Sequence, residues 1–213
     1  MKTILAYGDS LTYGASPIKD GPRHAYEDRW PTALEAALGG SARVIAEGLG
    51  GRTTVFDDHS SLADRNGARL LPTLLDSHKP LDLVIIMLGT NDLKIYINGT
   101  AFGAAMGIKR LIQIVRQHPY DAGQPVPQVV VVAPPLTVET DNADLHAMFA
   151  PRADEAKLFD HYYSRVAMEA GAGYFNAATV ATADARDGVH LDAENTRAIG
   201  TGLVPVVKSL LAL

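Results

Sequence analysis

A serine directly after the first apolar run is the residue of this chain whose position best suits covalent chemistry. Residues 1–7 are mostly apolar, and Ser10 follows them in the stretch Gly8-Asp9-Ser10-Leu11. A serine at the carboxyl end of a first strand, on a turn into a helix, is where α/β folds expose a reactive group. Its hydroxyl becomes a nucleophile at neutral pH only when a base takes its proton. Taken alone, these four residues are more often an ordinary turn.

The base that such a serine needs is best supplied by His190. Of the seven histidines, only His190 has an acid three residues before it in a short loop, Asp187-Gly188-Val189-His190. One loop turn can bring the Asp187 carboxylate to the imidazole, where it would fix the tautomer and stabilise the imidazolium. Without Ser10, the simpler interpretation is an Asp-Gly turn beside an incidental histidine.

Two further polar segments follow apolar runs. Residues 47–52 (EGLGGR) come after the run at 42–46, and residues 89–92 (GTND) come after the run at 81–88. The carboxyl ends of parallel strands share one edge of a sheet, so residues far apart in sequence can converge there. We therefore expect these segments to lie near Ser10 and His190.

The four segments together resemble the SGNH (GDSL) hydrolase family, from residue 4 to about residue 200. The stretches GDSLTYG, EGLGGRTT, DLVIIMLGTNDLK and DGVHLD are similar to the bacterial arylesterase/acyltransferase branch, some members of which are described as carbohydrate esterases. The resemblance implies a catalytic triad of Ser10, Asp187 and His190. It also implies an oxyanion hole made by the Ser10 amide, the Gly51 amide and the Asn91 side chain, which would stabilise the charge that grows on an attacked ester carbonyl.

Other residues near these motifs receive more modest roles. Asp9, Arg52 and Asp92 are more often structural at such positions, and Trp30, at helical spacing from Leu34, is expected in the core. Residues that flank the motifs or lie in the apolar segment 134–151 are expected to bind substrate: Leu11, Tyr13, Gly50, Lys94, Met148 and Phe149.

Composition excludes several function classes. The chain has 213 residues, 47% of them hydrophobic and 20% charged, with a net charge of −5 and no cysteine. There is no basic run that would suit nucleic acid or an anionic membrane, and thiol chemistry and disulfides are excluded. We expect no metal and no cofactor. No stretch suits a membrane-spanning helix or a signal peptide, which favours a cytoplasmic protein.

The order of the expected elements indicates one α/β domain over residues 1–213. Strand-like runs fall at 3–7, 42–46, 82–88, 128–133 and 173–176, with helical patterns at 30–38, 102–117, 153–170 and 194–212. Alternating strands and helices indicate a parallel sheet covered on both faces, a three-layer α/β/α arrangement. The resemblance implies a flavodoxin-like five-stranded sheet in the order 2-1-3-4-5.

The predicted function is a serine esterase that cleaves short-chain, acetyl-type esters of aryl or alkyl alcohols through an acyl-enzyme, with acyl transfer to alcohols as a further activity. A carbohydrate acetylesterase is the alternative, and a thioesterase or lysophospholipase is a further one. From other classes, a flavin-binding or anion-binding module and a structural subunit also remain open.

Three long connections, 14–29, 53–66 and 134–151, are expected to be functional or interface segments. Segment 134–151 is too apolar for a solvated loop, so it forms either a pocket wall or a subunit contact. The family branch forms compact oligomers, often octamers, so we expect a homo-oligomer whose loops make an apolar channel to Ser10.

Overall fold

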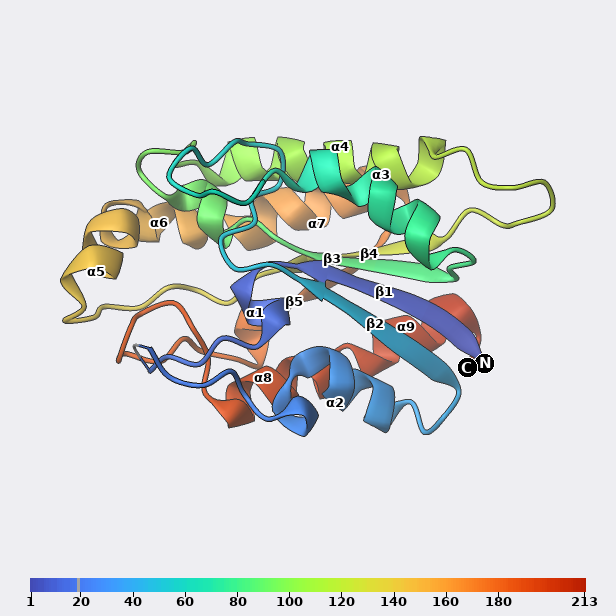
Figure 1. Ribbon diagram of the computed structural model, residues 1–213, viewed down its shortest axis with the longest axis horizontal. Helices are drawn as coiled ribbons and strands as arrows, with labels where there is room; N and C mark the ends of the chain where they lie inside the picture. The colour runs from blue at the N-terminus through green and yellow to red at the C-terminus, as the bar shows by residue number, and fades with distance from the viewer. Residues whose placement is uncertain (19) are drawn as a thin grey trace.

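The chain folds around a parallel five-stranded sheet, shown in the computed structural model of Figure 1, which describes residues 1–18 and 20–213. The strand order is β2-β1-β3-β4-β5, which confirms the predicted fold class. The strands are β1 (Lys2–Gly8), β2 (Ala42–Gly48), β3 (Leu83–Met87), β4 (Gln128–Ala133) and β5 (Gly173–Asn176).

Helices cover both faces of this sheet because its central strands are apolar on both sides. In β1, Leu5 and Tyr7 point into one buried cluster, whereas Ile4 and Ala6 point into the other. This alternation follows from the two-residue period of a strand. Helices α3 (Gly67–His78), α4 (Ala101–Gln117) and α7 (Phe159–Ala170) cover the first face, and α2 (Trp30–Ala37), α8 (Ala193–Gly202) and α9 (Val204–Leu211) cover the second (Figure 1).

Two predicted helices are each divided in the structure. The pattern at 194–212 forms α8 and α9, which are separated at Leu203, and Pro205 stands in the first turn of α9. Proline suits a first turn because its missing N–H needs no partner there, so it starts a new helix. The pattern at 153–170 likewise forms α6 (Ala153–Ala156) and α7. Trp30 is fully buried in the core, as expected.

Short helical segments lie mainly in the connections at the carboxyl edge of the sheet. They are α1 (Ser10–Tyr13), η1 (Tyr26–Asp28), η2 (Thr90–Leu93), α5 (Ala143–Phe149), η3 (Ala150–Arg152) and η4 (Ala177–Thr179). Among the described residues, no helix is both long enough and apolar enough to cross a lipid bilayer.

The register of the strands brings three connections together. Gly8, the last residue of β1, pairs with Gly48 at the end of β2 and with Met87 at the end of β3. The segments that follow these residues, 9–14, 49–52 and 88–93, therefore start side by side at one edge of the sheet.

Candidate active site

Ser10 is the first residue of α1, directly after the end of β1. The Asp9 side chain caps this short helix by accepting a hydrogen bond from the Leu11 N–H at 2.9 Å. Thr12 Oγ1 accepts a hydrogen bond from Trp30 Nε1 at 3.1 Å, which ties α1 to the core. The serine thus stands on a turn that is fixed from both sides, and it is half-buried.

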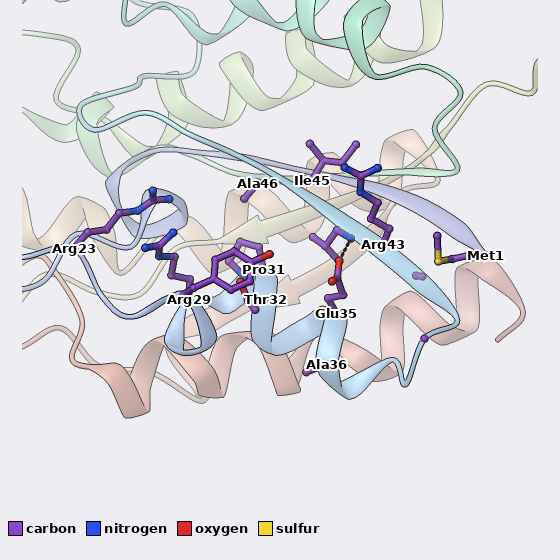
Figure 2. Close-up of a pocket in the computed structure, with 14 residues that line it drawn as sticks. Met1, Arg23, Arg29, Pro31, Thr32, Glu35, Ala36, Arg43, Ile45 and Ala46 are labelled. Carbon is purple, nitrogen blue, oxygen red and sulfur yellow. Dashed lines mark hydrogen bonds between the residues drawn. The ribbon is translucent and has the colours of Figure 1, made fainter.

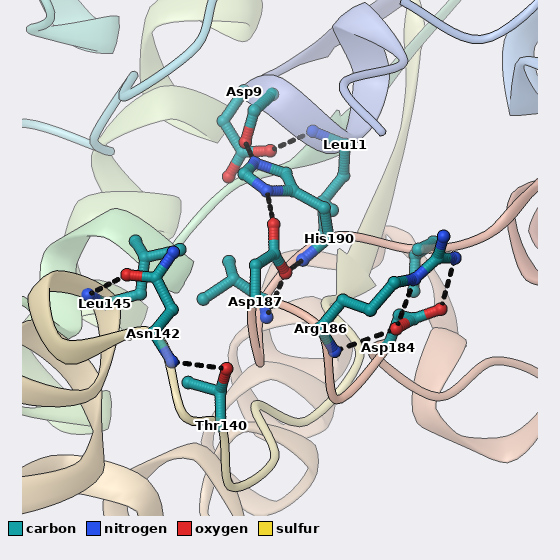
Figure 3. Close-up of polar contacts among 12 residues, drawn as sticks. Asp9, Leu11, Thr140, Asn142, Leu145, Asp184, Arg186, Asp187 and His190 are labelled. Carbon is teal, nitrogen blue, oxygen red and sulfur yellow. Dashed lines mark hydrogen bonds and ion pairs between the residues drawn. The ribbon is translucent and has the colours of Figure 1, made fainter. Parts of the chain in front are cut away.

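The three residues of the predicted triad form one hydrogen-bonded chain, and its contact between His190 and Asp187 is drawn in Figure 3. The Ser10 Oγ lies 3.0 Å from His190 Nε2, and His190 Nδ1 lies 2.6 Å from Asp187 Oδ2. The other oxygen of Asp187 accepts hydrogen bonds from the Val189 and His190 N–H groups at 2.9 and 2.8 Å. This arrangement suits His190 as the base that takes the serine proton.

Asp187 is held in its ionised form. Burial raises the pKa of its carboxyl, but the hydrogen bonds from the His190 ring and from two backbone N–H groups outweigh burial, and the net pKa lies below its ordinary value. A carboxylate at this place favours the His190 tautomer whose Nε2 accepts the serine proton, and it stabilises the imidazolium that results.

The loop that carries Asp187 and His190 is closed by its own hydrogen bonds. Asp184 N donates to the His190 carbonyl and Gly188 N donates to the Asp184 carbonyl, both at 2.8 Å. Arg186 pairs with the Asp184 carboxylate, visible beside the triad in Figure 3. Val138 N donates to the Gly188 carbonyl, so segment 134–142 is fastened to this loop.

Gly51 and Asn91, the other two predicted oxyanion donors, lie on the neighbouring connections. Gly51 has a φ of 81°, a left-handed conformation that favours glycine. Asn91 Nδ2 points toward two protein acceptors, Asp9 Oδ2 at 3.3 Å and the Arg52 carbonyl at 3.1 Å. Ser10, Gly51 and Asn91 all line one cavity, so the structure brings the three together.

Buried charged groups lie beneath this cluster. Burial raises the pKa of Asp9 to about 6 and that of Asp92 to about 7. The Arg52 guanidinium is also buried and donates from Nη1 to the Gly8 and Glu47 carbonyls, which end β1 and β2. Asp92 accepts hydrogen bonds from the Thr54 N–H and hydroxyl, so these acids bind protein groups rather than facing the cavity.

The cavity next to Ser10 has a volume of about 560 Å³. Of the six residues expected to bind substrate, five line it: Tyr13, Gly50, Lys94, Met148 and Phe149. Leu11 does not. It is 3% exposed and packs in the core cluster with Trp30, because it is the second residue of α1 and faces inward there.

Five lining residues are not among the sequence predictions: Ala15, Gly48, Leu49, Arg65 and Val189. The sequence could have indicated them only by position, since each lies within one of the quoted motifs or in one of the three long connections. Segment 134–151 supplies Leu145, Met148 and Phe149, so it does form a wall of the cavity.

A larger cavity, of about 790 Å³, lies between α2 and the edge strand β2 (Figure 2). Arginines 23, 29 and 43 line it, together with Glu35, whose carboxylate accepts a hydrogen bond from Val44 N at 2.6 Å. It has no histidine or serine among its lining residues, so we assign the chemistry to the smaller cavity.

Comparisons with known proteins agree with this geometry. A profile of the GDSL-like lipase/acylhydrolase family matches residues 6–197. A structure described as a carbohydrate acetylesterase family member from Sinorhizobium meliloti is 51% identical, with a TM-score of 0.97 and full coverage of both chains.

Two other solved structures are similar over almost the whole chain. A protein from Agrobacterium tumefaciens str. C58 is 48% identical, and the aryl esterase of M. smegmatis is 38% identical. Each has a TM-score of 0.93 and covers 99% of this chain and 100% of its own. A comparison with curated proteins gives no match. The chain therefore belongs to the GDSL-like lipase/acylhydrolase family and is a carboxylic ester hydrolase of the SGNH type, as its four sequence segments predict.

Proposed function

We propose that the protein is a serine esterase that cleaves short-chain esters of aryl or alkyl alcohols with Ser10 as nucleophile. The observation that carries this proposal is the continuous contact from Ser10 Oγ through His190 to Asp187 at the wall of a cavity. His190 takes the Ser10 proton as Oγ attacks the ester carbonyl, and the collapsing intermediate releases the alcohol, which receives that proton. Water then attacks the acyl-enzyme in the same way and releases the acid.

Gly51, Asn91 and the Ser10 amide serve in this proposal as the donors to the oxyanion. Donors held in place before the reaction stabilise the new charge without reorganisation. Leu145, Met148 and Phe149 supply an apolar wall, which suits the acyl chain or the aryl group of the substrate.

A carbohydrate acetylesterase is the second candidate. It is favoured by one observation, the similarity to a Sinorhizobium meliloti structure of that description. The same triad would remove an acetyl group from either alcohol, so the two candidates differ only in the alcohol that the cavity accepts.

The test is an activity profile over p-nitrophenyl esters of increasing acyl length, measured beside acetylated xylose and glucose. We expect the highest kcat/KM with acetyl and a steep loss with length. Ser10→Ala should lower turnover by at least about 10³-fold in a folded protein, checked by circular dichroism. A folded Ser10→Ala variant with normal turnover would exclude the acyl-enzyme, and a higher kcat/KM on acetylated sugars would favour the second candidate.

Assembly and acyl transfer are further parts of the proposal. We infer a homo-oligomer, with an octamer expected from the family branch, in which the loops near the cavity meet neighbouring chains. The exposed apolar side chains Ile18, Ile95 and Tyr96 support such contacts. Light scattering on a size-exclusion column would contradict this if it found a monomer at micromolar concentration.

An apolar approach to Ser10 would let a small alcohol compete with water for the acyl-enzyme. A vinyl ester mixed with a small alcohol in buffer should then give a new ester. Free acid as the only product would argue against acyl transfer. A cytoplasmic location stays a prediction from the sequence.

A further inference from the structure

Two residues of fixed positive charge, Arg65 and Lys94, line the cavity beside Ser10, and no aspartate or glutamate of the described residues lines it. The chain as a whole has a net charge of −5. The positive wall is therefore a local feature and does not follow from the overall composition.

Lys94 is already neutralised within the fold. Its ammonium lies 3.2 Å from Asp58 Oδ2, and the two side chains are 11% and 3% exposed. Ser60 donates two further hydrogen bonds to the same carboxylate, so Asp58 is fully engaged. An ion pair this well buried leaves little attraction for a substrate.

Arg65 is different, because the acids near it are paired with another residue. Asp57 and Asp64 form ion pairs with Arg69 at 2.7 and 2.8 Å. Arg65 Nε donates to Ser61 Oγ at 2.8 Å. Within the described part of the chain, neither of its terminal nitrogens has a hydrogen bond or an ion pair. A half-buried guanidinium thus keeps its charge and its two-pronged donor face available.

The Arg65 guanidinium lies close to the proposed oxyanion hole. Its central carbon and Nε both lie 3.5 Å from the point where a Cβ on Gly51 would stand. Gly51 is a proposed oxyanion donor and shares the cavity wall with Ser10, so an ester bound there has Arg65 near one of its ends. The apolar residues Leu145, Met148 and Phe149 line the same cavity and suit the uncharged part of a substrate.

We propose that Arg65 is a specificity-determining residue that selects esters with a carboxylate on the acyl chain or on the leaving alcohol. A carboxylate is planar and matches the guanidinium fork with two parallel hydrogen bonds. This inference rests on the proposed function, since it concerns the substrate of the same Ser10 site. Cleavage itself proceeds as for neutral esters, and the charged end only improves binding and orientation.

The test compares charged and neutral esters in two pairs. The acyl pair is 4-nitrophenyl hydrogen succinate against 4-nitrophenyl pentanoate, and the alcohol pair is 4-acetoxybenzoate against its methyl ester. For at least one pair, Arg65→Gln should lower the ratio of kcat/KM, charged over neutral, by about tenfold, which is a typical loss for a charge-assisted contact. Arg65→Lys should recover part of that ratio. Arg43→Gln serves as the control: it removes the same charge from the cavity between α2 and β2 and should leave the ratio unchanged.

The inference is overturned if Arg65→Gln leaves the ratio within about twofold of the wild-type value in both pairs. An equal fall for charged and neutral esters is one such case, and it would mean that Arg65 supports the oxyanion or the shape of the loop. Cleavage of the neutral esters by wild type and by Ser10→Ala is measured in the same assay. If that cleavage does not depend on Ser10, the proposed function fails. If it does depend on Ser10 but the ratio does not respond to Arg65→Gln, only this inference fails.

Salt provides a second measurement that needs no variant. Raising NaCl screens charge, so the wild-type kcat/KM for the charged ester of the responding pair should fall while that for its neutral partner stays constant. The net charge of −5 alone would repel an anion and would predict the opposite, a rise with salt. A rise would therefore contradict a role for Arg65 in anion recognition.

Discussion

At the scale of single residues, Asn91 is the most constrained of the proposed oxyanion donors. Its amide nitrogen is held between the Asp9 carboxylate and the Arg52 carbonyl. An amide has two N–H bonds, so an oxyanion would have to share one of those already directed at protein acceptors. The benefit is a donor that cannot rotate away, which is the preorganisation that oxyanion stabilisation needs.

Asn91→Ala should therefore act on the chemical step more than on binding. We expect kcat for p-nitrophenyl acetate to fall by about 10²–10³-fold with little change in KM. Steady-state kinetics measures both constants, and Asn176→Ala, which removes an amide outside the cavity lining, serves as a control. A pure increase in KM would instead assign Asn91 to ground-state binding.

The residues that could be predicted are those inside compact motifs. Ser10, Asp187 and His190 each lie in a short stretch whose spacing already suits their chemistry, and the structure brings them into contact. Arg65 could not be predicted, because its place depends on how the 53–66 connection folds back over Gly51. Leu11 was placed at the cavity because it follows Ser10, but one helical step turns it inward.

At the scale of elements, the site depends on close contact between the carboxyl end of β2 and α1, the short helix that carries Ser10. A Cβ on Gly48 would lie 2.1 Å from the Tyr13 backbone nitrogen. Only a glycine allows this approach, so Gly48 sets the distance between α1 and the loop that carries Gly51.

Gly48→Ala should cost both stability and activity. The clash is with backbone, so α1 or the end of β2 must move, and we expect a loss of about 2 kcal/mol or more in the free energy of unfolding. Urea unfolding measures the first effect and kcat the second. Gly50→Ala is the matched control for stability, because its added Cβ would meet only Ser10 Cβ, at 3.9 Å. Equal stability of the two variants would contradict the close approach.

Elements were predicted where local pattern decides them. The five apolar runs match the observed strands within two residues at each end. For β1, β3 and β4 the reason is burial on both faces, which leaves a continuous apolar run. The boundaries of the helices were harder to predict from the sequence. The breaks at 157–158 and at Leu203 interrupt patterns that stay amphipathic throughout, so periodicity alone does not reveal them. The strand order came from the family resemblance and not from the pattern.

At the scale of the whole molecule, stability should depend on pH through the buried acid Asp92. Its pKa is raised to about 7 by burial, from an ordinary value of 3.8. Between about pH 4 and pH 7 the unfolded chain has lost this proton while the folded chain keeps it. The folded state binds more protons there, so this group's contribution to stability falls as pH rises through that window.

Asp92→Asn should flatten this part of the stability profile. Urea unfolding of both proteins at intervals from pH 4 to pH 8 should show the wild type losing on the order of 3 kcal/mol relative to the variant. Asp144→Asn, at an exposed carboxyl, should follow the wild type. Parallel curves for wild type and Asp92→Asn would show that Asp92 has the same pKa in both states.

The contact between Ser10 and His190 joins residues 180 positions apart in the chain. All five strands precede residue 177, whereas the proposed base His190 and the helices α8 and α9, which cover one face of the sheet, come after it. A chain that stopped at residue 177 would carry Ser10, the proposed nucleophile, without the proposed base. Appearance of esterase activity during refolding would therefore report the docking of this last segment onto the sheet.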